Sequence, residues 1–136
     1  MPTHNKISKL IEIKDKATGK IIRLYEAVGF LNEGEAPIGG DEMMARVANE
    51  NGGAIIGEDV DFVWKHQDQI PPEEFQINFL VTNQCADPEF PRQITCFDFD
   101  GADNRWNRFC ESLDMMWGRP ALVIRRLPLP QATPNP

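Results

Sequence analysis

Residues 92–117 read RQITCFDFDGADNRWNRFCESLDMMW, and the structure of this stretch decides which fold the chain adopts. Its first part, residues 93–99, is short and rich in β-branched and aromatic side chains, which predicts a strand. Its second part places apolar side chains at helical spacing, namely Trp106, Phe109, Cys110, Leu113, Met116 and Trp117. Asp103 can cap the start of such a helix, and Gly118 can end it. The stretch therefore predicts a strand, an acidic turn and an amphipathic helix over residues 103–117.

Two further strands are predicted near the N-terminus, over residues 6–14 and 20–31, where isoleucines and other apolar residues alternate with polar ones. The connecting segment DKATGK contains Gly19, which can adopt the positive φ of a tight loop, so the two strands are expected to form a hairpin. The second strand is apolar on both of its faces. We therefore expect helices to cover one face and a partner to cover the other.

Two short helices are predicted between this hairpin and the next strand. Residues 41–51 carry an apolar stripe of Met43, Met44, Val47 and Ala48, and a glycine follows them. Residues 57–68 fit either a strand or a helix, because their apolar positions match both periods. Acidic residues at the front of this segment and Lys65 near its end complement a helix dipole, so we favour the helix.

The remaining elements are strands over residues 75–82 and 121–127, with a loop at residues 83–91. Together these elements predict an α+β fold, with an antiparallel or mixed sheet of about five strands and two or three helices packed on one face. We expect a single domain over residues 1–127. Residues 128–136, PLPQATPNP, form a proline-rich arm that cannot enter the interior of a sheet.

Composition limits the environment and the partners. The 136 residues carry a formal net charge of −7, which disfavours binding to nucleic acid or to an anionic membrane surface. The three cysteines form no CxxC pair, which is typical of a reducing compartment, and we expect Cys96 and Cys110 to be buried free thiols. No stretch resembles a signal peptide or reaches the roughly 20 apolar residues of a membrane helix. The sequence therefore predicts a cytoplasmic protein.

Asp98, Asp100 and Asp103 form the one acidic cluster that suggests chemistry. Three nearby carboxylates can hold Mg²⁺ or Ca²⁺, or work as an acid–base pair, which would suit a small metal-assisted hydrolase or another small-molecule enzyme. Asp-Gly is also ordinary turn chemistry, and the spacing does not match a calcium-binding EF-hand loop. We favour the turn and the helix cap, and we expect neither a metal nor a cofactor.

A second group of residues suggests binding rather than catalysis. Met115, Met116 and Trp117 are adaptable apolar side chains of the kind that interfaces use, although such residues also build cores. Leu127 and Leu129 give the proline-stiffened arm apolar groups with which to dock. The sequence therefore favours a non-catalytic binding or protein-interaction module that acts as a homodimer, with a protein or a small apolar ligand as partner. An acidic inhibitor of a basic protein is a further alternative.

Overall fold

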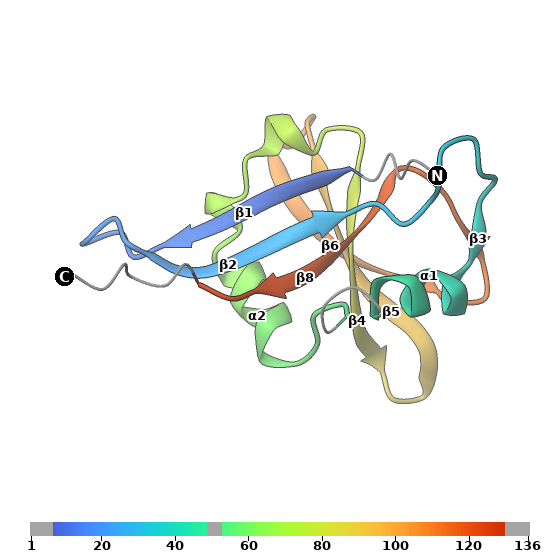
Figure 1. Ribbon diagram of the computed structural model, residues 1–136. Coiled ribbons are helices and arrows are strands. Elements are labelled where there is room, and N and C mark those ends of the chain that lie inside the picture. Colours follow the sequence, from blue (N-terminus) through green and yellow to red (C-terminus); the bar gives the residue numbers. More distant parts are fainter. Residues whose placement is uncertain (1–6, 49–52, 130–136) are drawn as a thin grey trace.

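The computed structural model describes residues 7–48 and 53–129, whose main feature is a six-stranded mixed sheet (Figure 1). Its strands lie in the order β1 (Ser8–Lys14), β2 (Ile21–Val28), β8 (Ala121–Leu127), β4 (Phe79–Asp87), β5 (Phe90–Asp100) and β6 (Arg105–Ser112). Neighbouring strands are antiparallel, except that β8 runs parallel to β4. The other elements are a small sheet of β3 (Ile38–Gly39) and β7 (Met116–Trp117), the helices α1 (Gly40–Ala48) and α2 (Glu58–Lys65), and the 3-10 helices η1 (Gln67–Gln69) and η2 (Pro72–Glu74). The predicted α+β class is confirmed.

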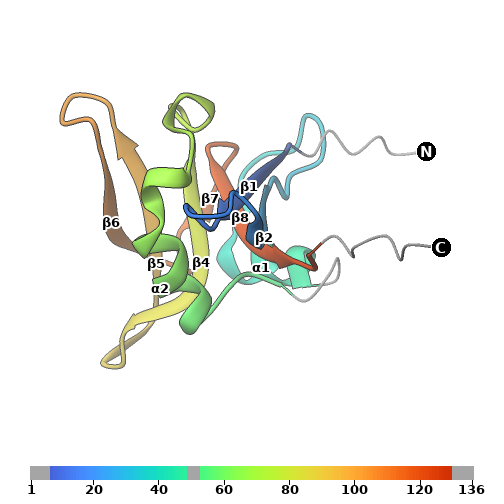
Figure 2. The ribbon, with the colours of Figure 1, turned by 90° about the vertical axis from the view of Figure 1, so that its left-hand side faces the viewer.

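The two helices pack on opposite faces of the sheet, where the sequence analysis expected a single covered face. Val60 of α2 belongs to one core cluster together with Leu122 of β8. Met43 of α1 belongs to a second cluster together with Val123, the next residue of β8. Successive residues of a strand point to opposite faces, so each cluster lies on its own side of the sheet. In Figure 2, α2 is seen in front of β4 and β5, whereas α1 lies to the right of β4. Both faces need cover because β4, β5 and β8 carry buried apolar side chains on both.

Residues 103–117 do not form a helix, so that prediction is wrong. The chain turns at residues 101–104 and returns as β6, with Asp100 paired to Arg105. Asn104 adopts a φ of 54°, a left-handed conformation that asparagine tolerates in turns. Trp106 packs in the cluster beside α2, whereas Phe109 packs against the cluster beside α1. What looked like one helical stripe is therefore the two faces of a strand, each of them partly covered.

Most other predicted elements are confirmed. The β1–β2 hairpin, α1, α2 and β8 lie where the sequence placed them, although the predicted end of the first helix falls partly on residues 49–51, outside the described residues. β4 begins later than predicted and continues through residues 83–87, which were predicted as a loop. Ile77, which lies inside the predicted strand over residues 75–82, precedes β4 and is 84% exposed.

Within residues 7–48 and 53–129, no helix is long and apolar enough to cross a membrane. The two α-helices contain nine and eight residues. A bilayer needs about 20 residues of helix.

Candidate functional site

The three aspartates that suggested chemistry lie where β5 turns into β6. Asp98 and Asp100 are alternate residues of β5 and share a face, whereas Asp103 lies in the turn. Asp100 accepts the backbone N–H groups of Ala102 (2.9 Å) and Asp103 (3.3 Å), so its carboxylate closes the turn. Asp103 caps no helix, contrary to prediction, and its carboxylate lies 3.9 Å from the guanidinium of Arg105.

This cluster gives little support to catalysis. Among the described residues, no group of three or more histidine, cysteine, aspartate or glutamate side chains is arranged to hold a metal ion. Asp98 Oδ1 is buried, and no described residue forms a hydrogen bond with it. Because Asp100 is engaged with the turn backbone, the arrangement supports turn formation better than an acid–base pair.

The residues predicted for an interface are divided between surface and core. Met116 pairs with Gly39 in the small sheet and is 60% exposed, and Met115 is also exposed. Trp117 is only 1% exposed, and its ring lies 6.0 Å from the ring of Phe79 between centroids. Trp117 is therefore a core residue, which leaves the two methionines as a small surface feature.

The described start of the predicted arm lies at the end of β8. Leu127 is half-buried and pairs with Leu24 of β2, and Leu129 is exposed. Residues 130–136, the rest of the predicted arm, lie outside the described residues.

The cysteines follow the prediction only in part. All three are free, and Cys96 is fully buried, which raises the pKa of its thiol. Cys110 is exposed on β6 rather than buried, because β6 is an edge strand and not the predicted helix. Cys85 and Cys110 line one small cleft of about 300 Å³, together with the side chain of Arg108.

A feature that the sequence analysis did not identify is the free edge of β1. The backbone N–H of Gly29 donates to the carbonyl of Ile7 (2.8 Å), and these residues continue the β1–β2 register. In an antiparallel pair, hydrogen-bonded positions alternate with positions whose N–H and C=O point away from the partner. The backbone groups of Ser8, Leu10 and Glu12 therefore point away from β2. Within the described residues, no hydrogen bond reaches them.

The end of this edge is closed by a side chain. Gln69 accepts the backbone N–H of Lys14 through Oε1 (2.7 Å) and donates from Nε2 to the carbonyl of Lys14 (2.9 Å). The amide of Gln69 thus takes the place that a peptide group of a neighbouring strand would occupy. It leaves the stretch before Lys14 open.

A groove of about 800 Å³ runs beside the open stretch, between β1 and the segment around η2. Lys9 lies across it, since its Nζ bonds the carbonyl of Glu74 and lies 5.2 Å from the ring centroid of Phe75. Glu12 and Glu73 add two exposed carboxylates to the groove walls. The free backbone groups therefore border a space in which a chain segment can lie.

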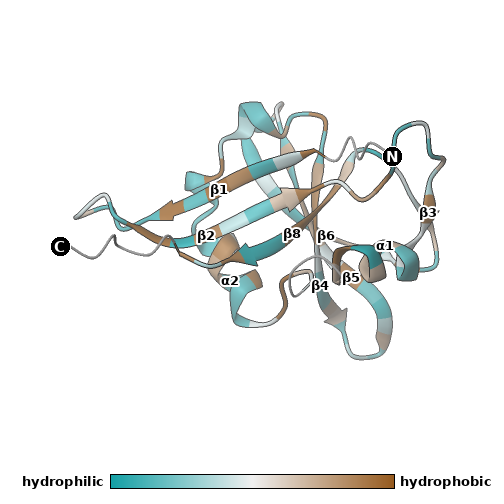
Figure 3. Cartoon of the chain, viewed as in Figure 1, coloured by the Kyte–Doolittle hydropathy of each residue, from teal (hydrophilic) through white to brown (hydrophobic). Residues whose placement is uncertain are grey.

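The face of β1 and β2 away from α2 is also partly uncovered. Leu10 is 53% exposed there, and Ile22 of β2, near the Lys14 end of the hairpin, is exposed on the same face. Glu26, which pairs with Leu10, forms an ion pair with Arg125 of β8 at an Nε to Oε1 distance of 2.7 Å. Figure 3 shows hydrophobic and hydrophilic positions mixed along both strands. The sequence predicts helices on one face of the second strand and a partner on the other; Ile22 is exposed on the face away from α2, and the partner stays a prediction.

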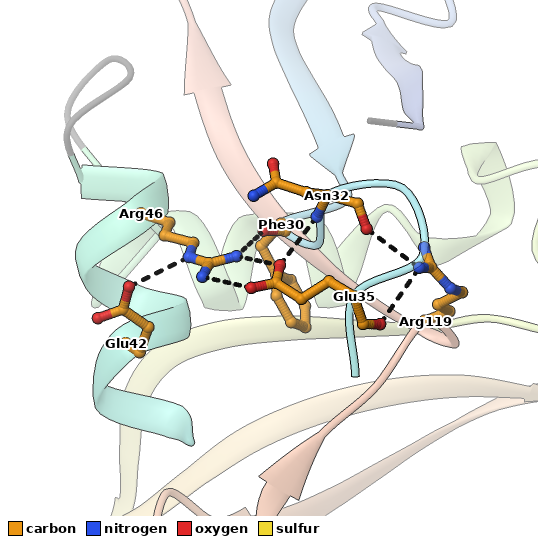
Figure 4. A network of polar contacts seen from close by, with 6 residues as sticks. All are labelled: Phe30, Asn32, Glu35, Glu42, Arg46 and Arg119. Carbon is orange, nitrogen blue, oxygen red and sulfur yellow. Dashed lines mark hydrogen bonds and ion pairs between the residues drawn. The ribbon is translucent and has the colours of Figure 1, made fainter. Parts of the chain in front are cut away.

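A polar network elsewhere in the molecule holds a loop in place (Figure 4). Arg46 of α1 pairs with both carboxylate oxygens of Glu35, at 2.5 and 2.8 Å, and donates to the carbonyl of Phe30. The Arg46 guanidinium, with the N–H of Asn32, holds the pKa of Glu35 at about 2. Arg119 also donates to the carbonyls of Asn32 and Glu35. These contacts join α1 to the loop between β2 and β3, which is a structural role.

The strand edge could have been anticipated from one signal. The first predicted strand carries the charged residues Lys9, Glu12 and Lys14, and charged side chains, lysine especially, are typical of edge strands. The contribution of Gln69 had no such signal, because it is 55 residues from Lys14.

Comparison of the chain with protein-family models, curated proteins and solved structures finds no match.

Proposed function

We propose that this protein is a non-catalytic binding module that acts as a homodimer, and that its interaction surface is the free edge of β1. The observation that carries this proposal is the unpaired backbone of Ser8, Leu10 and Glu12 beside an open groove. A partner chain can bind an exposed strand edge by adding one of its own strands to the sheet. Natural proteins usually block strand edges that do not bind a partner.

The surroundings of the edge favour binding over chemistry. Leu10 and Ile22 supply exposed apolar contacts on the adjoining face. Lys9 is held by backbone and ring contacts rather than left free to react. The expected absence of nucleic-acid and membrane partners, and the cytoplasmic location, remain predictions from net charge and composition.

Light scattering over a range of concentrations tests the proposal. We expect the wild-type chain to be dimeric and Leu10→Pro to be monomeric. Proline removes the outward N–H of Leu10 and places a ring where a partner strand would lie. It breaks no bond to β2, because the Leu10 N–H points away from that strand. The melting temperature of the variant should therefore stay close to that of the wild type.

Ile77→Thr is the matched control, since Ile77 is exposed and lies outside the edge. It removes a surface hydrophobic group and should leave the dimer intact. A wild-type chain that stays monomeric, or a Leu10→Pro variant that dimerises as well as the wild type, contradicts the proposal.

A further inference from the structure

We infer that the strand added to β1 is β1 of a second copy, antiparallel, with the twofold axis passing through Leu10. The inference rests on the proposed function and specifies the partner and the register of the same site. It follows from which backbone groups are free, which registers Gln69 blocks, and which side chains then face each other.

An incoming strand can form hydrogen bonds only with every second residue of β1, because the backbone groups of the residues between them point towards β2. In the part of β1 that the structure describes, Ser8, Leu10 and Glu12 present free N–H and C=O groups to the outside, and Lys14, the next residue in this series, is already bonded to Gln69. A partner can therefore form hydrogen-bonded pairs along a stretch with Leu10 at its centre.

The position of the axis follows from these limits. An axis at Glu12 or at Ile11 needs the backbone groups of Lys14, which Gln69 occupies. An axis at Glu12 also sets two carboxylates directly opposite each other, which is destabilising. An axis at Lys9 or Ser8 leaves Glu12 without a partner in the described stretch. An axis at Leu10 pairs every free residue of one copy with a free residue of the other.

The side chains suit this register. Leu10, which is half exposed in the monomer, meets Leu10 of the second copy on the axis and loses apolar surface to solvent. Glu12 lies opposite Ser8 of the second copy, a small polar residue without like charge. The pairing also joins the two sheets into one continuous sheet and removes both β1 edges, which is how proteins eliminate exposed edges.

The main competitor is a head-to-tail contact through β6, the other free edge of the sheet. The N–H of Leu113 donates to the carbonyl of Arg92 (2.8 Å) in register with the β5–β6 pair, so Arg108 and Cys110 present outward backbone groups. Pairing of β1 with β6 is heterologous and would build rings or filaments instead of a closed dimer.

Oxidative cross-linking of full-length variants distinguishes these arrangements. On the axis, hydrogen-bonded partners have Cα atoms about 5.5 Å apart, within the range of a disulfide. Leu10→Cys in a Cys110→Ser background should therefore cross-link to a covalent dimer under mild oxidation. Glu12→Cys should not cross-link to itself, because the two residues lie roughly 14 Å apart along the strands at about 3.4 Å per residue. Glu12→Cys mixed with Ser8→Cys should cross-link.

Light scattering on the same proteins separates the two proposals. Dimers that do not cross-link through Leu10→Cys would overturn the register and leave the proposed function standing. A Leu10→Cys variant that cross-links only when Cys110 is retained would show the head-to-tail contact and overturn the twofold pairing. Monomers would overturn the proposed function together with this inference.

Discussion

Tyr25 shows how a single side chain ties α2 to the sheet. Its ring is fully buried, and its hydroxyl donates to Asp59 Oδ1 at 2.7 Å. Asp59 Oδ1 also accepts hydrogen bonds from the guanidinium groups of Arg23 (3.4 Å) and Arg126 (3.5 Å). One carboxylate of α2 therefore binds side chains of both β2 and β8. Burial first, and then the hydrogen bond to Asp59, raises the pKa of Tyr25 to about 12.

A spectrophotometric titration can test this environment, because Tyr25 is the sole tyrosine of the chain. We expect the phenolate of the folded protein to form near pH 12, and that of the denatured chain near its ordinary pKa of 10. A raised pKa means that this contribution to stability is complete below pH 10 and is lost as the pH rises towards 12. Asp59→Asn should lower the midpoint, whereas the control Asp61→Asn, on the same helix, should not. Equal midpoints in the folded and denatured chains would contradict the assignment.

At the scale of elements, α1 is positioned by a close backbone contact. The N–H of Gly40, the first residue of α1, donates to the carbonyl of Leu113 at 3.1 Å. A Cβ added at Gly40 would lie 2.8 Å from Leu113 Cα, and backbone atoms cannot move aside as a flexible side chain can. The connection between β6 and β7 therefore needs glycine at the start of α1.

Gly40→Ala should destabilise the fold by about 1–3 kcal/mol, the usual cost of forcing extra atoms into a packed site. Gly39→Ala is a matched control, since a Cβ at Gly39 has no atom within 4 Å. Urea denaturation of both variants measures the difference in the free energy of unfolding. If the two variants unfold at the same urea concentration, the close contact is not the reason for glycine at this position.

At the scale of the whole molecule, the sequence and the structure point to different interaction surfaces. The sequence predicts that the C-terminal arm takes part in self-association. The structure offers the β1 edge, which is separated from β8 by β2 and needs no residue beyond Leu127.

A chain that ends at Leu127 decides between them. If β1 is the interface, the truncated protein should dimerise with the affinity of the full chain, as measured by light scattering or sedimentation. The full chain with Leu10→Pro is the complementary control and should be monomeric. Loss of the dimer on truncation alone would assign the interface to residues 128–136.

Local patterns in the sequence were sufficient for several elements. The β1–β2 hairpin, α1, α2 and β8 were predicted because alternation, helical spacing and charges at helix ends act within a few residues of each other. An acidic turn after β5 was also recognised, although the predicted helix began at Asp103, inside the observed turn. For these segments the local preference and the final packing agree.

Tertiary structure alone decided the rest. Residues 105–112 form β6 because β5 offers a full ladder of partners and both faces of the sheet bury apolar groups, with Trp106 on one side and Phe109 on the other. Such two-sided burial imitates a helical stripe in sequence. The exposed position of Cys110 and the pairing of Gln69 with Lys14 depend on contacts between distant segments. The sequence by itself determined which segments are apolar and where most of them bend. The edges at β1 and β6 are free because non-local pairing placed the other four strands inside the sheet.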